Sequence, residues 1–140
     1  MAVEFFVDDN FDIAALSNSE ELTDLIFRYD PIIVGLDDFQ AVLSLSRLFF
    51  QNEKQAPPEI IKTLTDEIKI YRLSADLNNK IASFERGEMN DWARLWREDK
   101  YWKELGYAGM GIWSNLYFIH DLSRISVNEN KNLYVAVENQ

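Results

Sequence analysis

The segment from Phe39 to Phe50 constrains the fold most strongly, because it is apolar on nearly every side of a helix. A helix with so little polar surface is usually buried at the centre of its domain. We therefore expect a helix that is capped by Asp37, runs to about Gln51 and forms the central element of the core.

The composition supplies enough apolar material for one core around this helix. The chain has 140 residues, which favour a single domain over residues 1–140, and 47% of them are hydrophobic. The absence of cysteine excludes disulfides and thiolate metal sites. The first residues do not resemble a signal peptide, and no apolar run reaches the roughly 20 residues needed to cross a membrane. We expect a soluble, cytoplasmic protein.

Further elements are predicted from periodicity and from helix start and stop signals. Residues 3–6 favour a short strand. Ser17 and Asn18 each precede a glutamate by three residues, as in a capping box, and predict a helix over 19–29. Residues 59–86 are expected to be helical, as one curved helix or as two with a break near 74–79. Another helix is expected over 90–105.

The C-terminal part leaves one choice open, because residues 112–122 fit either a helix or a strand. Residues 124–137 favour a β-hairpin, since β-branched and aromatic residues flank a polar turn. The sequence as a whole predicts an α+β domain that is predominantly helical. It would contain four to five helices, a short N-terminal strand and a C-terminal β-hairpin.

A partial calcium-binding pattern lies near the N-terminus. Asp8, Asn10 and Asp12 occupy the first three ligand positions of the loop, but Ile13 stands where the turn needs glycine. Ser19 stands where a bidentate glutamate belongs. We therefore expect a solvated acidic loop or a partner contact here, and no metal.

Two other patterns could suggest catalysis or nucleotide binding. His120 and Asp121 are sequence neighbours, but no nucleophile motif accompanies them, so we expect a structural histidine. Gly106, Gly109 and Gly111 match no nucleotide-binding motif, and a helix C-cap followed by a turn is expected. We expect no enzymatic activity and no cofactor.

Three tryptophans at helical spacing, Trp92, Trp96 and Trp102, are interleaved with basic residues. Rings in such a setting can stack on bases, but neighbouring acids nearly neutralise the basic charge. We expect the rings to pack in the core. One exposed tryptophan, or Tyr101, would then be open to a partner.

The charge of the chain is concentrated near its N-terminus. The formal net charge is −10, and residues 1–40 contain ten acids against one base, Arg28. Such a surface attracts basic partners and repels phosphates and anionic membranes. We expect a basic protein partner, with no binding to nucleic acid or membranes. The expected contact residues are Asp8, Asp9, Asp12, Glu20, Glu21, Asp24, Asp37 and Asp38.

With this acidic stretch, the chain resembles the immunity proteins of bacterial toxin systems, including those of contact-dependent growth inhibition and related polymorphic toxins. The resemblance covers length, charge and the lack of a catalytic motif. It implies tight inhibition of a cognate toxin, often a basic nuclease. The alternatives are a nucleic-acid mimic that occupies a DNA-binding protein, and an enzyme that uses His120 or an acidic pair.

Overall fold

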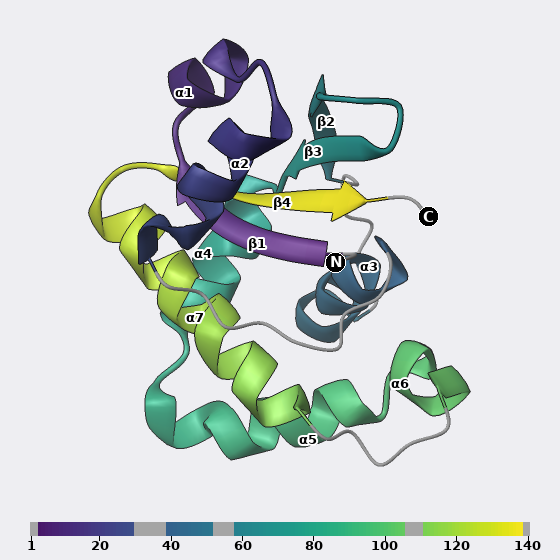
Figure 1. The fold of residues 1–140 in the computed structure, drawn as a ribbon. Coiled ribbons are helices and arrows are strands. Elements are labelled where there is room, and N and C mark those ends of the chain that lie inside the picture. Colours follow the sequence, from purple (N-terminus) through teal and green to yellow (C-terminus); the bar gives the residue numbers. More distant parts are fainter. Residues whose placement is uncertain (1–2, 30–38, 52–57, 106–110, 139–140) are drawn as a thin grey trace.

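The computed structural model describes residues 3–29, 39–51, 58–105 and 111–138. These residues form three layers, with an antiparallel sheet between two groups of helices (Figure 1). Helices α1 and α2 lie above the sheet in this view, and the other helices lie below it. The α+β class is confirmed, but the described residues contain seven α-helices rather than four to five.

The sheet has the strand order β1–β4–β3–β2, and every neighbouring pair is antiparallel. Its strands are β1 (Val3–Asp8), β2 (Glu59–Thr63), β3 (Ile68–Arg72) and β4 (Asn132–Glu138). Side chains alternate between the two faces of a strand. In β1, Phe5 and Val7 therefore enter the core below the sheet, whereas Phe6 enters the core above it.

The thicker layer contains α3 (Phe39–Phe49), α4 (Ala75–Ser83), α5 (Met89–Arg97), α6 (Lys100–Leu105) and α7 (Ile112–Asn128). The predicted helix around residues 39–50 is confirmed, although its expected cap at Asp37 lies outside the described residues. Its expected central position is wrong. Helix α7 is the central one, with Leu116 and Ile119 fully buried, and it packs against α4, α5 and the sheet.

The thinner layer contains α1 (Asn10–Ala15), α2 (Ser19–Ile26) and the 3-10 turn Phe27–Tyr29. Asn18 caps α2 by accepting a hydrogen bond from the Glu21 N–H (2.9 Å), and the Glu21 carboxylate accepts one from the Ser17 N–H (2.9 Å). The predicted start of this helix is therefore confirmed. Residues 10–12, which were expected in a loop, instead begin α1.

The long helix expected over 59–86 is wrong in its first half. Residues 59–72 form the hairpin of β2 and β3, and only 75–83 are helical. The segment IKIYR at 68–72 carries β-branched and aromatic residues that suit a strand, and its helical periodicity was accidental. A boundary does lie at the start of the expected break, because Ser74 caps α4 by accepting from the Leu77 N–H (3.1 Å). It separates a strand from a helix, and residues 75–79 are helical.

The expected C-terminal hairpin is also wrong, since residues 124–128 are the last turns of α7 and only 132–138 form a strand. Residues 112–122, which fitted either a helix or a strand, form the first part of α7 and are helical. Asn130 adopts a positive φ of 55°, which allows the chain to leave the helix and enter β4. The helix expected over 90–105 is divided into α5 and α6 near Asp99.

No helix in the ranges that the structure describes combines the length and apolarity needed to span a lipid bilayer.

Candidate functional site

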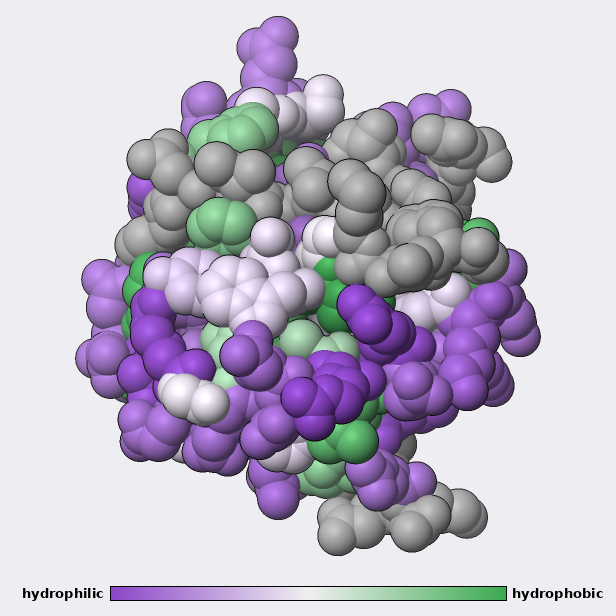
Figure 2. Space-filling view, turned by 90° about the horizontal axis from the view of Figure 1, so that it is seen from below, coloured by the Kyte–Doolittle hydropathy of each residue, from purple (hydrophilic) through white to green (hydrophobic). Residues whose placement is uncertain are grey.

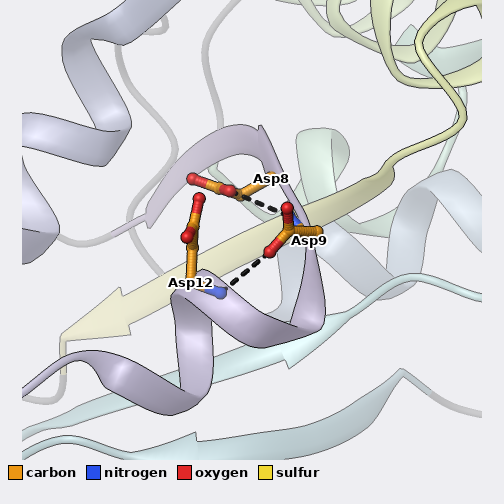
Figure 3. Close-up of side chains that lie close together, drawn as sticks. All are labelled: Asp8, Asp9 and Asp12. Carbon is orange, nitrogen blue, oxygen red and sulfur yellow. Dashed lines mark hydrogen bonds between the residues drawn. The ribbon is translucent and has the colours of Figure 1, made fainter.

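Three carboxylates gather where β1 ends and α1 begins (Figure 3). Asp8 is the last residue of β1, and Asp9 caps α1 by accepting a hydrogen bond from the Asp12 N–H (2.8 Å). This cap brings Asp12 back over the end of the strand. One carboxylate oxygen from each of the three aspartates lies within 4.8 Å of the others. We call these three residues the aspartate cluster.

Asp8 is the buried member of the aspartate cluster, with none of its surface exposed. Its Oδ1 accepts a hydrogen bond from the Asp9 N–H (2.9 Å), whereas its buried Oδ2 has no hydrogen-bond partner. Burial follows from strand alternation, because Asp8 lies on the same face of β1 as Phe6, beneath α1 and α2. A partner could therefore not contact Asp8 directly, although Asp8 was among the expected contact residues.

Arg28 partly compensates the negative charge of the aspartate cluster. Its Nη1 lies 3.4 Å from Asp8 Oδ2 and 3.8 Å from Asp12 Oδ2. Both separations exceed the roughly 2.7–2.9 Å of a charge-assisted hydrogen bond. The guanidinium therefore attracts both carboxylates without closing a hydrogen bond to either.

Burial raises the pKa of Asp8 to about 6. The neighbouring Asp12 carboxyl acts in the same direction, while the Asp9 N–H and Arg28 lower the pKa of Asp8. The ionised form of Asp8 is thus costly in this position. The cluster would be stabilised by a proton or by more positive charge than Arg28 supplies.

Polar groups from β4 and α1 border the aspartate cluster. The Tyr134 hydroxyl donates a hydrogen bond to Asn10 Oδ1, and Asn132 Nδ2 donates to the Tyr134 oxygen (3.2 Å). Burial raises the pKa of Tyr134. Asn10, a ligand in the calcium-loop pattern, is therefore engaged within the protein. The loop geometry of that pattern is absent from this described segment, because α1 begins at Asn10.

The other predicted contact residues that can be located lie on the outer side of α2. Leu22, Leu25 and Ile26 point into the core above the sheet, so Glu20 and Asp24 face solvent. Glu21 is exposed as well, and hydrogen bonds from Ser17 lower its pKa. Asp37 and Asp38 lie outside the described residues.

Basic residues near α1 and α2 neutralise this outer side only in part, through the attraction of Lys62 for the Glu21 carboxylate. Arg28 is directed at the aspartate cluster, and Lys62 of β2 donates to the backbone carbonyls of Ala14 (2.9 Å) and Leu16 at the end of α1. Glu20 and Asp24 form no ion pair with any described residue.

Acids in the rest of the described chain are paired more often. Ion pairs of 2.7–3.9 Å join Arg47–Asp99, Arg72–Glu59, Arg86–Asp121, Arg94–Asp91, Lys103–Glu98 and Arg124–Glu85. The charge imbalance seen in the sequence therefore persists in the fold, on the outer side of α1 and α2.

Exposed aromatic residues lie in the same layer, and the sequence reasoning missed them. Phe11 of α1 is 80% exposed and Phe27, just after α2, is 55% exposed. In the sequence, Phe11 lies between acids of the aspartate cluster. This context could have indicated its exposure, whereas helical periodicity alone did not. Aromatic side chains beside charged groups are common anchors of protein interfaces.

On the opposite side of the molecule, the described residues show a different pattern. Figure 2 views it from below, and hydrophilic residues separate small apolar patches over the described part of this face. Leu95 of α5 (46% exposed) and Trp113 of α7 (45% exposed) belong to helices of the thicker layer. Scattered patches of this kind are normal for a soluble surface.

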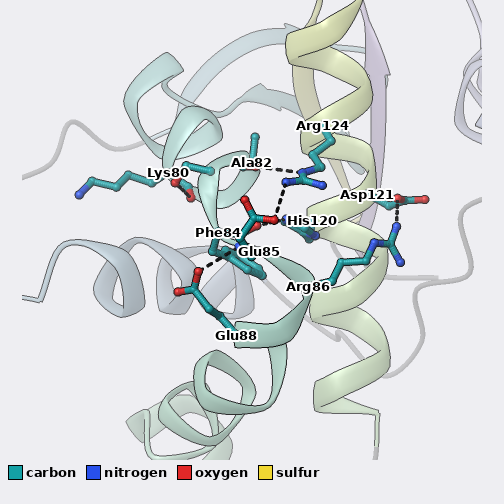
Figure 4. Close-up of polar contacts among 10 residues, drawn as sticks. Lys80, Ala82, Phe84, Glu85, Arg86, Glu88, His120, Asp121 and Arg124 are labelled. Atoms are coloured by element: carbon teal, nitrogen blue, oxygen red, sulfur yellow. Dashed lines mark hydrogen bonds and ion pairs between the residues drawn. The ribbon is translucent and has the colours of Figure 1, made fainter.

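The buried histidine has a structural role, as expected. His120 Nε2 donates a hydrogen bond to the Phe84 carbonyl oxygen (2.8 Å), and its ring stacks on Phe84 with centroids 4.0 Å apart (Figure 4). Burial lowers its pKa, which favours the neutral form. Asp121 instead pairs with Arg86 (2.7 Å), so the two sequence neighbours form no catalytic pair.

The tryptophans behave mainly as core residues. Trp96 and Trp102 are buried, and Trp96 Nε1 donates to Ser44 Oγ (2.7 Å). Tyr101 is also buried, which corrects the expectation that it is open to a partner. Of the three glycines considered, only Gly111 lies in the described residues, as the N-cap of α7 with a φ of 90°.

The chain matches no protein-family model, and no curated protein or solved structure shows significant similarity to it. The chemistry of the site is therefore the basis for interpreting its function.

Proposed function

We propose that the protein inhibits a basic protein by binding it, as an immunity protein binds its toxin, through the outer side of α1 and α2. The observation that carries this proposal is the combination of unpaired carboxylates with exposed aromatic rings in one layer. Glu20 and Asp24 have no ion-pair partner among the described residues, and Phe11 and Phe27 project from the same layer.

The proposed binding combines charge and apolar contact. Exposed carboxylates on α2 attract lysine and arginine side chains that would otherwise hold the phosphates of a nucleic acid. Phe11 supplies an apolar anchor that excludes water from neighbouring charge pairs. Inhibition then follows from covering the partner's substrate-binding surface, inside the cell that produces it. No catalytic step by this chain is required.

The proposed roles of the acids differ with their burial. Glu20, Glu21 and Asp24 are exposed and would make direct contacts, and Asp9 and Asp12 lie at the margin. Asp8 would act only through Arg28 and the position of α1, because it is buried. Asp37 and Asp38 remain proposed contacts on the basis of charge alone.

The proposal is tested by first identifying the partner and then reversing charge on α2. The partner is sought by pull-down from the native host and by expressing the product of the adjacent upstream gene, where a secreted protein with a basic C-terminal domain is expected. Glu20→Lys/Asp24→Lys should weaken binding by at least 100-fold in calorimetry and remove protection against the partner's activity. These two substitutions leave the caps at Asn18 and Asp9 intact.

Asp66→Lys/Glu67→Lys is the matched control, because these acids are exposed in the β2–β3 turn and form no ion pair with a described residue. It makes the same change in net charge and should weaken binding less than five-fold. Equal affinities for the two double variants would contradict the proposed surface. A partner that binds DNA, and whose DNA binding the protein blocks, would favour the nucleic-acid mimic instead.

A further inference from the structure

The aspartate cluster carries more negative charge than its surroundings compensate. Three carboxylates face one guanidinium, which leaves two negative charges when all are ionised. The oxygen Asp8 Oδ2 is buried, points toward Asp12 and receives no hydrogen bond (Figure 3). Buried carboxylate oxygens are nearly always satisfied by a donor or by a metal ion. Arg28 Nη1 attracts Asp8 Oδ2 from 3.4 Å but donates no hydrogen bond to it, so this buried oxygen can still accept a cation.

We propose that Asp8, Asp9 and Asp12 together bind one divalent cation, and that Ca²⁺ is the ion that fits. The site shares Asp9 and Asp12 with the margin of the proposed partner surface, but its test uses the isolated chain and requires no partner.

The size of the aspartate cluster suits calcium. Calcium–oxygen distances are about 2.3–2.6 Å, so two oxygens on one Ca²⁺ lie at most about 5 Å apart. The three aspartate oxygens satisfy this limit, with mutual distances within 4.8 Å. Mg²⁺ binds oxygen at about 2.0–2.1 Å and demands near-octahedral geometry, which limits the spread to about 4.2 Å. The cluster is therefore better matched to Ca²⁺.

The site differs from the calcium loop that the sequence failed to match. That pattern would use Asn10, whose side-chain oxygen instead accepts from Tyr134. The proposed site uses Asp9, which the loop pattern leaves out. Asp9 joins because it caps α1 and so lies beside Asp8 and Asp12. Asp9 and Asp12 are partly exposed, which leaves room for water to complete the coordination.

Arg28 competes with the ion for the same oxygens. Its side chain is 41% exposed and makes no hydrogen bond to the aspartates, so it can move into solvent when a cation enters. This competition predicts a modest affinity, with a Kd on the order of 10⁻⁴ M, in the weak range of protein calcium sites.

The experiment titrates chelator-treated protein with CaCl₂ at pH 7.5 and constant ionic strength, using isothermal calorimetry. We expect one site per chain. Asp12→Asn should weaken Ca²⁺ binding at least ten-fold, because it removes one anionic ligand and keeps its size. Arg28→Gln should strengthen binding several-fold, because it removes the competing cation. Mg²⁺ should bind at least ten-fold more weakly than Ca²⁺.

Asp24→Asn is the matched control, since it makes the same chemical change on the exposed side of α2, at a residue that does not belong to the cluster. It should alter the Ca²⁺ affinity less than two-fold. An absence of saturable binding, or equal weakening by Asp12→Asn and Asp24→Asn, would overturn the proposed site. Circular dichroism confirms that each variant is folded.

Discussion

At the scale of single residues, Asp8 is the most unusual group in the described structure. Its carboxylate is buried beneath α1 and α2, with one oxygen unsatisfied, and burial raises its pKa to about 6. The net charge of the aspartate cluster depends on whether Asp8 is protonated and on which cation lies beside it. This feature could not be predicted from the sequence, where Asp8 resembles any acid that follows a strand.

The raised pKa of Asp8 makes stability depend on pH in a defined window. An unfolded aspartate has a pKa near 3.9, so between about pH 4 and 6 the folded protein binds the extra proton. Stability is therefore greatest below this window and falls as pH rises through it, by up to about 3 kcal/mol from this group. Asp8→Asn, measured by urea unfolding with chelator present, should lack this fall and be more stable than the unchanged protein at pH 7. A parallel pH dependence in both proteins would contradict the raised pKa.

Ser44 provides a second test at this scale. Its buried hydroxyl accepts the Trp96 Nε1–H hydrogen bond (2.7 Å), which connects α3 to α5. Ser44→Ala should lower the free energy of unfolding by about 1–3 kcal/mol, because it leaves the indole N–H unsatisfied. Ser46→Ala, on the same helix and only partly buried, should cost less than about 1 kcal/mol in the same denaturant measurement.

At the scale of elements, features that depend on local contacts were predicted better than features that depend on contacts between distant parts of the chain. The cap at Asn18 was predictable, because it depends on a side chain reaching a backbone N–H three residues away. The break was expected from a shift of the apolar stripe, and the Ser74 cap marks its actual position. The β2–β3 hairpin was misassigned because its apolar residues also fit a helical spacing. The strand at β4 was predicted, but its partner was wrong because that partner is distant in the chain. In particular, β4 pairs with β1 and β3, and neither is its sequence neighbour.

The candidate site shows the same division. The acidic character of residues 8–24 was visible in the sequence, and so was the helix that exposes Glu20 and Asp24. The gathering of three aspartates depends on where β1 ends and on the Asp9 cap, and the exposure of Phe11 depends on α1, which was predicted as a loop.

The N-cap of α2 can be tested by itself. Asn18→Ala should lower the free energy of unfolding by about 1 kcal/mol, because it leaves the Glu21 N–H without its side-chain acceptor. Asn18→Ser should retain most of the stability, since serine caps comparably. If alanine and serine cost the same in denaturant unfolding, the capping role assigned to Asn18 would be incorrect.

At the scale of the whole molecule, the charge of −10 and its concentration near α1 and α2 oppose folding through repulsion. Raising NaCl from 0.05 to 0.5 M, with chelator present, should therefore raise the melting temperature. Glu20→Lys/Asp24→Lys should show a smaller rise, because part of the repulsion has been removed. An equal salt response in the two proteins, measured by thermal scans, would place the repulsion elsewhere.

The position of β4 between β1 and β3 also has a consequence for how the chain acquires its structure. During synthesis, the residues of α1 and α2 emerge long before Tyr134 and Ala136, which complete the core beneath them. The acidic layer therefore cannot settle onto the sheet until nearly all the described residues have been translated, and contacts this distant in sequence form slowly. A nascent chain would carry its negative charge early and acquire its rigid surface last.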